Sequence, residues 1–120
     1  MRRRRVLIAD DNARSRSGLR ALLSTRAEVE VIGEAVNGQE AVRLMEECRP
    51  DAVLMDAQMP VMNGVEATRL IKERWPGCRV VVQTMYPSYR ADALAAGADA
   101  FVSKADPPER LLAAIGQIDV

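Results

Sequence analysis

The most constraining feature of this sequence is an apolar run that ends on one carboxylate in the middle of the chain. Residues 52–55 read Ala-Val-Leu-Met, and Asp56 follows them directly. An uninterrupted apolar run of this length is typical of a strand that is buried on both faces of a parallel sheet. Open α/β sheets bind ligands at the carboxyl ends of their strands. We therefore expect Asp56 at such an edge, as a metal ligand, a nucleophile or a loop cap.

Strand and helix patterns alternate along the whole chain. Apolar runs predict strands that start near residues 5, 29, 52, 79 and 100, and a helical pattern follows each of them. Asn37 with Glu40, and Asn63 with Glu66, have the spacing of helix caps. Strict alternation predicts a parallel sheet with helices on both faces. The expected fold is a flavodoxin-like, doubly wound (βα)5 domain with strand order 2-1-3-4-5, in which strand 2 lies at an edge.

Composition excludes several classes of protein. The 120 residues carry 17 basic and 17 acidic side chains, so no global field attracts nucleic acid or membrane, and we expect Arg2–Arg5 to be a solvated flank. The sequence has neither a membrane-spanning apolar stretch nor a signal peptide, and Cys48 and Cys78 resemble reduced cytoplasmic cysteines. It contains no histidine, which removes histidine-based acid–base and metal chemistry. We expect one domain over residues 1–120, without an output domain and located in the cytoplasm.

Polar side chains stand at the predicted ends of four strands. Asp10 and Asp11 follow strand 1, Asp56 ends strand 3, Thr84 ends strand 4 and Lys104 follows strand 5. Taken singly, an acidic pair is often a turn or helix cap, a threonine is usually structural, and a lysine is usually solvated. In a parallel sheet, however, these four ends converge on one crevice, so the set as a whole predicts a site.

The chemistry of this set favours a phosphoryl group. Two carboxylates about 4 Å apart repel by about 4 kcal/mol at an effective dielectric near 20, so a crowded acidic cluster must bind a cation, become protonated or spread apart. Mg²⁺ suits oxygen ligands and phosphate oxygens, Lys104 can meet a phosphoryl oxygen, and Thr84 can donate a hydrogen bond to another. A carboxylate such as Asp56 can be the nucleophile that forms an aspartyl phosphate.

The chain resembles the receiver domain of bacterial two-component response regulators, and in particular the NarL/FixJ class with LuxR-type outputs. The segments that carry the resemblance span most of the chain: Val6–Asp11, Met55–Gly64, Thr84 and Gly97–Lys104. The resemblance implies that Asp56 is the phosphoacceptor. It also implies that Asp10, Asp11, Asp56 and the backbone carbonyl of Gln58 bind Mg²⁺ or Mn²⁺, with Asp10 often acting through water. Thr84 and Lys104 would contact the phosphoryl group.

The same resemblance implies partners and a switch. A sensor histidine kinase would donate the phosphoryl group, and Thr84 and Phe101 would move in response. That motion would alter the face made by helix 4, strand 5 and helix 5, which a partner or a second copy would bind, and DNA would be bound only by an output domain absent here. Gln58, Met85 and Tyr86 would tune the lifetime of the phosphorylated state. An aromatic residue such as Phe101 at a strand end is also a common core residue.

Three departures from the family pattern affect these expectations. Met85 stands where many receivers have a small residue, which restricts access to the phosphoryl group. The segment 84–97 is shorter than in many receivers, so the length of the fourth helix is open. Ala105 replaces the proline that often follows the lysine in a cis bond, and the sequence leaves the isomer of that bond open.

Other functions are weighed on the same residues. A phosphohydrolase of the haloacid-dehalogenase class needs an acidic residue two positions after the nucleophile, whereas this chain has Gln58, so turnover would be slow at most and we do not expect an enzyme. A flavin carrier would meet repulsion between its phosphate and the Asp10–Asp11 pair. A pseudo-receiver that binds partners without phosphorylation is disfavoured by the complete set of site residues.

Overall fold

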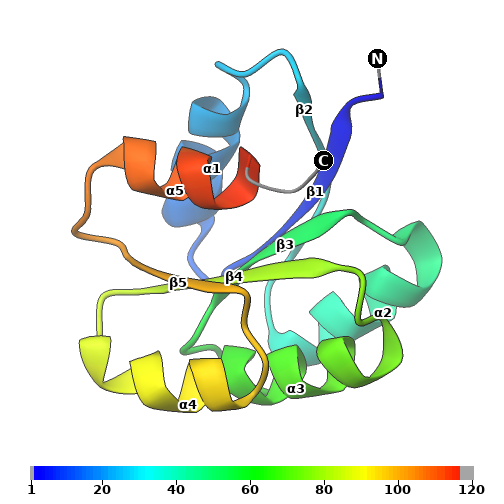
Figure 1. Cartoon of the computed structure of the whole chain (residues 1–120), viewed down its shortest axis with the longest axis vertical. Coiled ribbons are helices and arrows are strands. Elements are labelled where there is room, and N and C mark those ends of the chain that lie inside the picture. Colours follow the sequence, from blue (N-terminus) through cyan, green and yellow to red (C-terminus); the bar gives the residue numbers. More distant parts are fainter. Residues whose placement is uncertain (1, 117–120) are drawn as a thin grey trace.

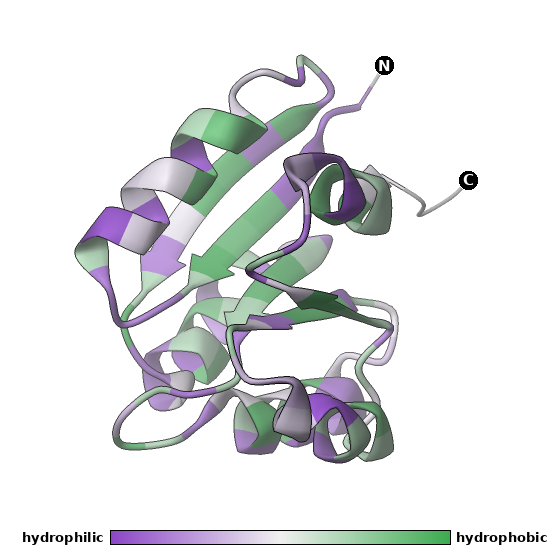
Figure 2. Cartoon of the chain, turned by 90° about the vertical axis from the view of Figure 1, so that its left-hand side faces the viewer, coloured by the Kyte–Doolittle hydropathy of each residue, from purple (hydrophilic) through white to green (hydrophobic). Residues whose placement is uncertain are grey.

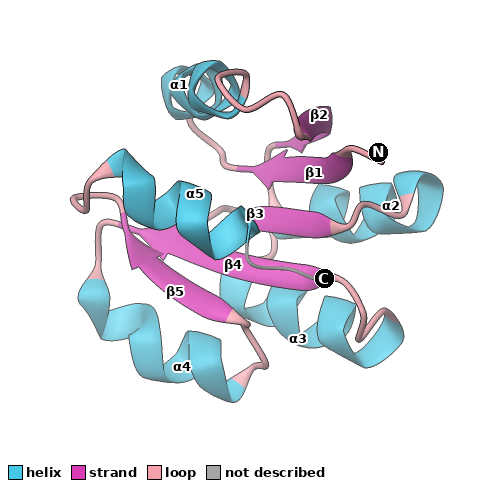
Figure 3. Ribbon diagram, turned by 45° about the horizontal axis from the view of Figure 1, so that its top comes forward, coloured by secondary structure: helices cyan, strands magenta, loops and turns pink. Residues whose placement is uncertain are grey.

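The fold is a five-stranded parallel sheet covered by helices on both faces (Figures 1 and 3). A computed structural model describes residues 2–116. The strand order is β2-β1-β3-β4-β5, which confirms the predicted order and the edge position of the second strand. The elements in chain order are β1 (Arg4–Ala9), α1 (Ala13–Leu23), β2 (Val29–Ala35), α2 (Gly38–Cys48), β3 (Ala52–Asp56), α3 (Gly64–Arg74), β4 (Arg79–Thr84), η1 (Pro87–Tyr89), α4 (Arg90–Ala95), β5 (Ala100–Ser103) and α5 (Pro108–Gly116).

The sheet separates two apolar layers. Alternate residues of the central strands face opposite sides, so Val53 and Met55 pack with α2, α3 and α4, whereas Ala52 and Leu54 pack with α1 and α5. In Figure 2 the strands are largely hydrophobic and the helices carry hydrophilic stretches. The apolar run that precedes Asp56 is therefore buried on both faces, as its composition predicts.

Several predicted helix boundaries are confirmed, and others shift. Asn37 and Asn63 each accept a backbone N–H in the first turn of their helices, as the cap spacing predicts. Gly97 has φ +103° and follows α4, in the left-handed conformation that terminates many helices. The sequence has helical spacing over residues 13–26, but α1 ends at Leu23. Apolar and polar residues alternate over 28–32, which predicts a shorter second strand than the observed β2, which extends to Ala35.

The polypeptide between β4 and β5 is compact. α4 has only six residues and follows the single 3₁₀ turn η1. The short fourth helix agrees with the short segment that the sequence shows between Thr84 and Gly97. The Lys104–Ala105 bond is trans, since residues 2–116 contain no cis peptide bond.

The basic N-terminal run is more than a solvated flank. Arg2 forms an ion pair with Asp51, Arg3 donates to the carbonyls of Ala27 and Val29, and Arg5 donates to the carbonyl of Arg49. These contacts tie the beginning of β1 to neighbouring loops at the end of the sheet away from Asp56. These arginines therefore have a structural role at the start of the sheet.

Two further predictions concern the cysteines and membrane-spanning segments. Cys48 and Cys78 are both free thiols, and Cys78 is buried, where burial raises the pKa of its thiol to about 12. No helix among the described residues is both long enough and apolar enough to cross a membrane.

Candidate functional site

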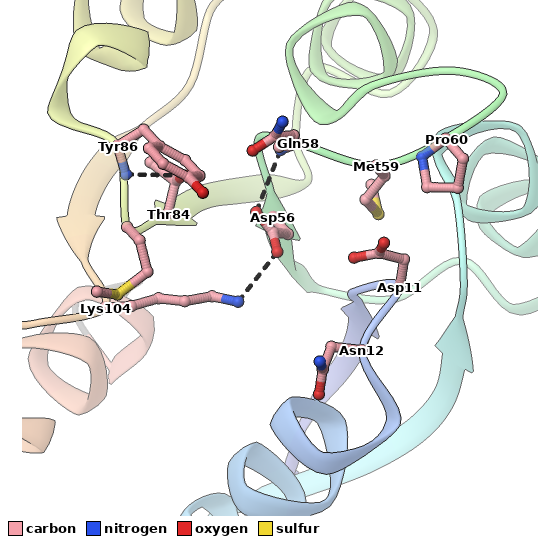
Figure 4. A pocket seen from close by; sticks show the side chains of 10 residues that line it. Asp11, Asn12, Asp56, Gln58, Met59, Pro60, Thr84, Tyr86 and Lys104 are labelled. Carbon is pink, nitrogen blue, oxygen red and sulfur yellow. Dashed lines mark hydrogen bonds and ion pairs between the residues drawn. The ribbon is translucent and has the colours of Figure 1, made fainter.

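The ends of four strands meet at one cleft, as the sequence predicts. The cleft has a volume of about 540 Å³ and lies at the carboxyl ends of β1, β3, β4 and β5 (Figure 4). Asp10 lies behind it, almost fully buried, and Phe101 lies away from it. The residues that line the cleft are Asp11, Asn12, Asp56, Gln58, Met59, Pro60, Thr84, Met85, Tyr86 and Lys104.

A close backbone contact fixes the position of Asp56. Gly64, the first residue of α3, packs so tightly against β3 that a Cβ atom there would lie 1.9 Å from the carbonyl oxygen of Asp56. Its N–H donates to the carbonyl of Ala57 at 2.9 Å. The Asp56 carboxylate also accepts the N–H of Gln58 at 3.1 Å. Only glycine allows α3 to begin this close to the strand end, so the Asn63–Gly64 pair serves both helix capping and site geometry.

Three carboxylates converge in the cleft. One carboxylate oxygen from each of Asp10, Asp11 and Asp56 lies within 4.8 Å of the others. Asp11 is exposed, whereas Asp10 is buried and the side chain of Asp56 is only 11% exposed. This all-oxygen donor set fits a hard divalent cation such as Mg²⁺, which neutralises clustered carboxylates.

The Lys104 ammonium joins two of these carboxylates. Its Nζ lies 2.8 Å from Asp10 Oδ2 and 3.0 Å from Asp56 Oδ2. The backbone N–H of Lys104 donates to the carbonyl of Thr84 at 2.9 Å, so the end of β5 is fixed beside the end of β4. The cation therefore stands where it can offset the negative charge of the cluster.

The pKa values of the two bridged carboxylates are shifted in opposite directions. Burial opposes ionisation of Asp10, but hydrogen bonds from Lys104, Ser15 and the N–H of Asn12 outweigh it, so the pKa of Asp10 is lowered. Asp56 has fewer donors, and burial raises its pKa above the usual value although Lys104 partly offsets this. Burial alone would lower the pKa of Lys104, but its bonds to the two carboxylates raise it.

Thr84, Met85 and Tyr86 are consecutive residues that line the cleft at the end of β4. Thr84 is buried, and its hydroxyl oxygen accepts the N–H of Tyr86 at 3.2 Å. The side chains of Met85 and Tyr86 are more than half exposed at the mouth of the cleft. The ring of Tyr86 meets that of Tyr89 edge-on, with centroids 6.4 Å apart. The sequence-based concern about a bulky Met85 therefore applies to the cleft entrance.

Phe101 stands on β5 beside Val82 of β4 and is partly buried. It packs against the apolar layer that also includes Ala93 of α4 and the partly buried Tyr89. The aromatic ring thus lies in the layer of α4, outside the cleft lining.

Ser15 belongs to the site, although sequence reasoning did not select it. Its hydroxyl donates to Asp10 Oδ2 at 2.6 Å, and its oxygen accepts a hydrogen bond from Lys104 at 3.2 Å. A sequence signal does exist, because Ser15 is the third residue of a helix that Asn12 caps directly after the acidic pair. Side chains of an α-helix tilt toward its N-terminus, so a residue in the first turn can reach back toward the preceding strand end.

Fold and site together combine a five-stranded parallel sheet with an acidic cluster, a lysine and a threonine at adjacent strand ends. The family of response regulator receiver domains matches residues 6–116, and the chain belongs to this family.

Individual relatives agree with this assignment. The chain is 41% identical over 110 residues to the uncharacterized transcriptional regulatory protein YhcZ of Bacillus subtilis, covering 90% of this chain and 51% of that protein. A LuxR-family two-component response regulator from Aurantimonas sp. SI85-9A1 superposes with a TM-score of 0.87 at 35% identity, covering 92% of this chain and 80% of that one. The response regulator domain of Thermotoga maritima CheB superposes with a TM-score of 0.91 at 32% identity, covering 99% and 100%.

These relatives confirm the predicted similarity to response regulators with LuxR-type outputs. The chain spans about half the length of the curated relatives that it matches.

Proposed function

We propose that this receiver domain accepts a phosphoryl group on Asp56 and acts as a phosphorylation-controlled switch. The observation that carries the proposal is the contact of Lys104 with both Asp10 and Asp56, at 2.8 and 3.0 Å, inside a cluster of three carboxylates. A nucleophilic carboxylate beside acidic cation ligands and a lysine has the composition needed to stabilise phosphoryl transfer.

In the proposed reaction a carboxylate oxygen of Asp56 attacks the phosphorus of a phosphohistidine on a sensor kinase. A P–O bond forms to Asp56, the P–N bond breaks, and its electron pair stays on the departing imidazole. Lys104 meets the charge of the phosphoryl oxygens, and the N–H of Gln58 holds the Asp56 carboxylate in position. Small phosphoryl donors such as acetyl phosphate would react in the same way.

Asp10, Asp11, Asp56 and the backbone carbonyl of Gln58 would hold Mg²⁺ or Mn²⁺, with Asp10 acting through water. Asp10 suits an indirect role because its carboxylate already accepts hydrogen bonds from Lys104, Ser15 and the N–H of Asn12. When bound, the metal supplies positive charge that offsets the repulsion between the carboxylates and the phosphoryl oxygens.

The switch would run from Thr84 to the face made by α4, β5 and α5. Thr84 is poised between the cleft and the Tyr86 backbone, and Phe101 packs in the layer of α4. A phosphoryl group that attracts Thr84 would favour one arrangement of the loop 84–89, and Phe101 would follow by turning inward. The altered face would be read by an output domain or by a second copy of the chain.

The lifetime of the phosphorylated state would depend on the cleft entrance. Gln58, Met85 and Tyr86 line the cleft and would control how water reaches the phosphoryl group. Gln58 cannot act as the acid that a true phosphohydrolase needs at this position. The domain would therefore transfer and lose phosphate slowly, as a signalling protein.

The relatives support a proposal about the wider biological role. Their names describe transcriptional regulators, so we propose a cytoplasmic protein that receives its phosphoryl group from a sensor histidine kinase. DNA binding would belong to an output domain outside these 120 residues.

The proposal is tested by intact mass measurement after incubation with acetyl phosphate and Mg²⁺. We expect one added phosphoryl group on the unmodified chain and on Asp92→Asn, which changes an exposed carboxylate that does not line the cleft. We expect none on Asp56→Asn or when EDTA removes the metal. An adduct of equal yield on Asp56→Asn, or no adduct on any folded sample, would contradict the proposal.

A further inference from the structure

Ser15 contacts both charged partners of the candidate site. It lies in the first turn of α1, where its backbone N–H donates to Asn12 Oδ1 at 2.9 Å. Its hydroxyl donates to Asp10 Oδ2 at 2.6 Å, and its oxygen lies 3.2 Å from Lys104 Nζ. The helix cap and the side-chain bonds together hold this half-buried hydroxyl between Asp10 and Lys104.

Ser15 differs from the other two hydrogen-bond acceptors of Lys104. An ammonium group has three hydrogens to donate, and Lys104 Nζ has three acceptors, namely Asp10, Asp56 and Ser15. Ser15 is the neutral acceptor of the three and the most distant one. An incoming phosphoryl oxygen can therefore replace the Ser15 contact at a lower electrostatic cost than either carboxylate contact.

The backbone around Asp10 is held independently of Ser15. Arg16 donates to the carbonyl of Asp10 at 2.7 Å and forms an ion pair with Glu34 of β2. The N–H of Asp10 donates to the carbonyl of Ala35 at 3.0 Å. Because these bonds anchor the loop, the Ser15 hydroxyl is not required to place the Asp10 backbone, and its contacts act on the side chains of Asp10 and Lys104.

We propose that Ser15 is a positioning residue for phosphoryl transfer, whose hydroxyl orients the Asp10 carboxylate and keeps the Lys104 ammonium directed at Asp56. This inference rests on the proposed function. In the resting site the hydroxyl completes the bonds of Lys104, and during transfer it yields its place to a phosphoryl oxygen. The Lys104 ammonium then needs only a small movement to meet that oxygen.

The test compares Ser15→Thr with Ser15→Val, which have nearly the same shape and differ in the hydroxyl. Phosphorylation of the full chain by acetyl phosphate is followed by intact mass at saturating Mg²⁺, so that metal affinity does not limit the rate. We expect Ser15→Thr to react within about threefold of the unmodified chain and Ser15→Val about tenfold more slowly, the effect of losing a hydrogen bond to charged groups. Ser15→Val should unfold at a lower temperature than Ser15→Thr, because the Asp10 carboxylate loses a hydrogen bond, so both rates are measured at a temperature where each variant is fully folded.

Ser15→Ala provides a second comparison should Ser15→Val fail to fold. Alanine leaves room for a water molecule, so we expect a rate between those of Ser15→Val and Ser15→Thr. Equal rates for Val, Ala and Thr, or equal losses in all three, would overturn the role of the hydroxyl while leaving the proposed function in place. Failure of the unmodified chain to take up a phosphoryl group would overturn the proposed function and this inference with it.

Discussion

Lys104 Nζ lies 3.0 Å from Asp56 Oδ2, across 48 positions of the sequence. The same ammonium group lies 2.8 Å from Asp10 Oδ2, so it bridges two carboxylates that would otherwise repel each other. A cation from solution that binds this cluster competes with Lys104 for the same oxygens. The lysine therefore sets both the stability of the metal-free cluster and its affinity for metal.

Replacement of Lys104 by methionine tests this competition. We expect Lys104→Met to bind Mg²⁺ about tenfold more tightly, because the carboxylates lose the cation that offsets their charge. Without metal the variant should be less stable by about 2 kcal/mol, the cost of removing hydrogen bonds to charged groups. Isothermal titration calorimetry and urea unfolding measure the two effects. Unchanged or weaker Mg²⁺ binding would contradict the competition.

The raised pKa of Asp56 predicts a specific pH dependence of stability. Because the folded-state pKa lies above the ordinary value near 3.8, ionised Asp56 destabilises the fold at neutral pH, and this penalty disappears as pH falls through the folded-state pKa toward the ordinary value. Asp56→Asn should therefore stabilise the metal-free protein at pH 7, and the gain should shrink on acidification. Urea unfolding at a series of pH values measures this. A gain that stays constant with pH would contradict the assigned direction.

Asp10 should show the opposite dependence. Its folded-state pKa is lowered, so its contribution to stability is present above the ordinary value and is lost as pH falls through the folded-state pKa. In the same urea series we expect Asp10→Asn to destabilise the protein at pH 7. This loss of stability should become smaller at acidic pH. A stabilising effect at pH 7 would contradict the lowered pKa.

Gly64 predicts a steric effect on the site. A Cβ atom there would overlap the carbonyl of Asp56, so Gly64→Ala should lower the free energy of unfolding by about 1–3 kcal/mol, the usual cost of overpacking a core. The same substitution should slow phosphorylation, because it displaces Asp56. Gly18 is the matched control, since a Cβ atom added at this position would meet no neighbouring atom within 4 Å and alanine favours its helix. We expect Gly18→Ala to gain up to about 1 kcal/mol. Equal effects at both positions would refute the steric explanation.

Val61 has an unusual backbone for its residue type. Its φ is +70°, in the left-handed region that β-branched residues disfavour by about 1–2 kcal/mol, and its side chain is 76% exposed. Val61→Gly should therefore stabilise the domain by about 0.5–1 kcal/mol, after the entropic cost of glycine. Val36, an exposed valine without positive φ, should lose stability when changed to glycine. Urea unfolding of both variants measures the two changes in stability. An equal loss of stability in both variants would contradict backbone strain at Val61.

The sequence predicts most of the site because of one property of parallel sheets. All carboxyl strand ends lie on the same edge, so Asp11, Asp56, Thr84 and Lys104 could be placed together from strand boundaries alone. Asp10 joins them because its buried carboxylate reaches Lys104.

Other features depend on three-dimensional contacts that no periodic pattern encodes. The Ser15 hydroxyl depends on how α1 starts relative to β1, and the arginine contacts at the base of the sheet depend on loops far away in sequence. The extension of β2 to Ala35 arises from its pairing with β1, which has a register shift at Val6–Leu7. Tertiary pairing thus overrides the local alternation that predicted a shorter strand.

The most direct test of the central claim is to locate the phosphoryl group within the chain. Borohydride reduces an aspartyl phosphate to homoserine, and peptide mass mapping then identifies the converted residue. After treatment with acetyl phosphate and Mg²⁺, we expect homoserine at position 56 and unmodified aspartate at positions 10 and 11. Homoserine at position 10 or 11, or a phosphorylated protein that contains none, would contradict Asp56 as the phosphoacceptor.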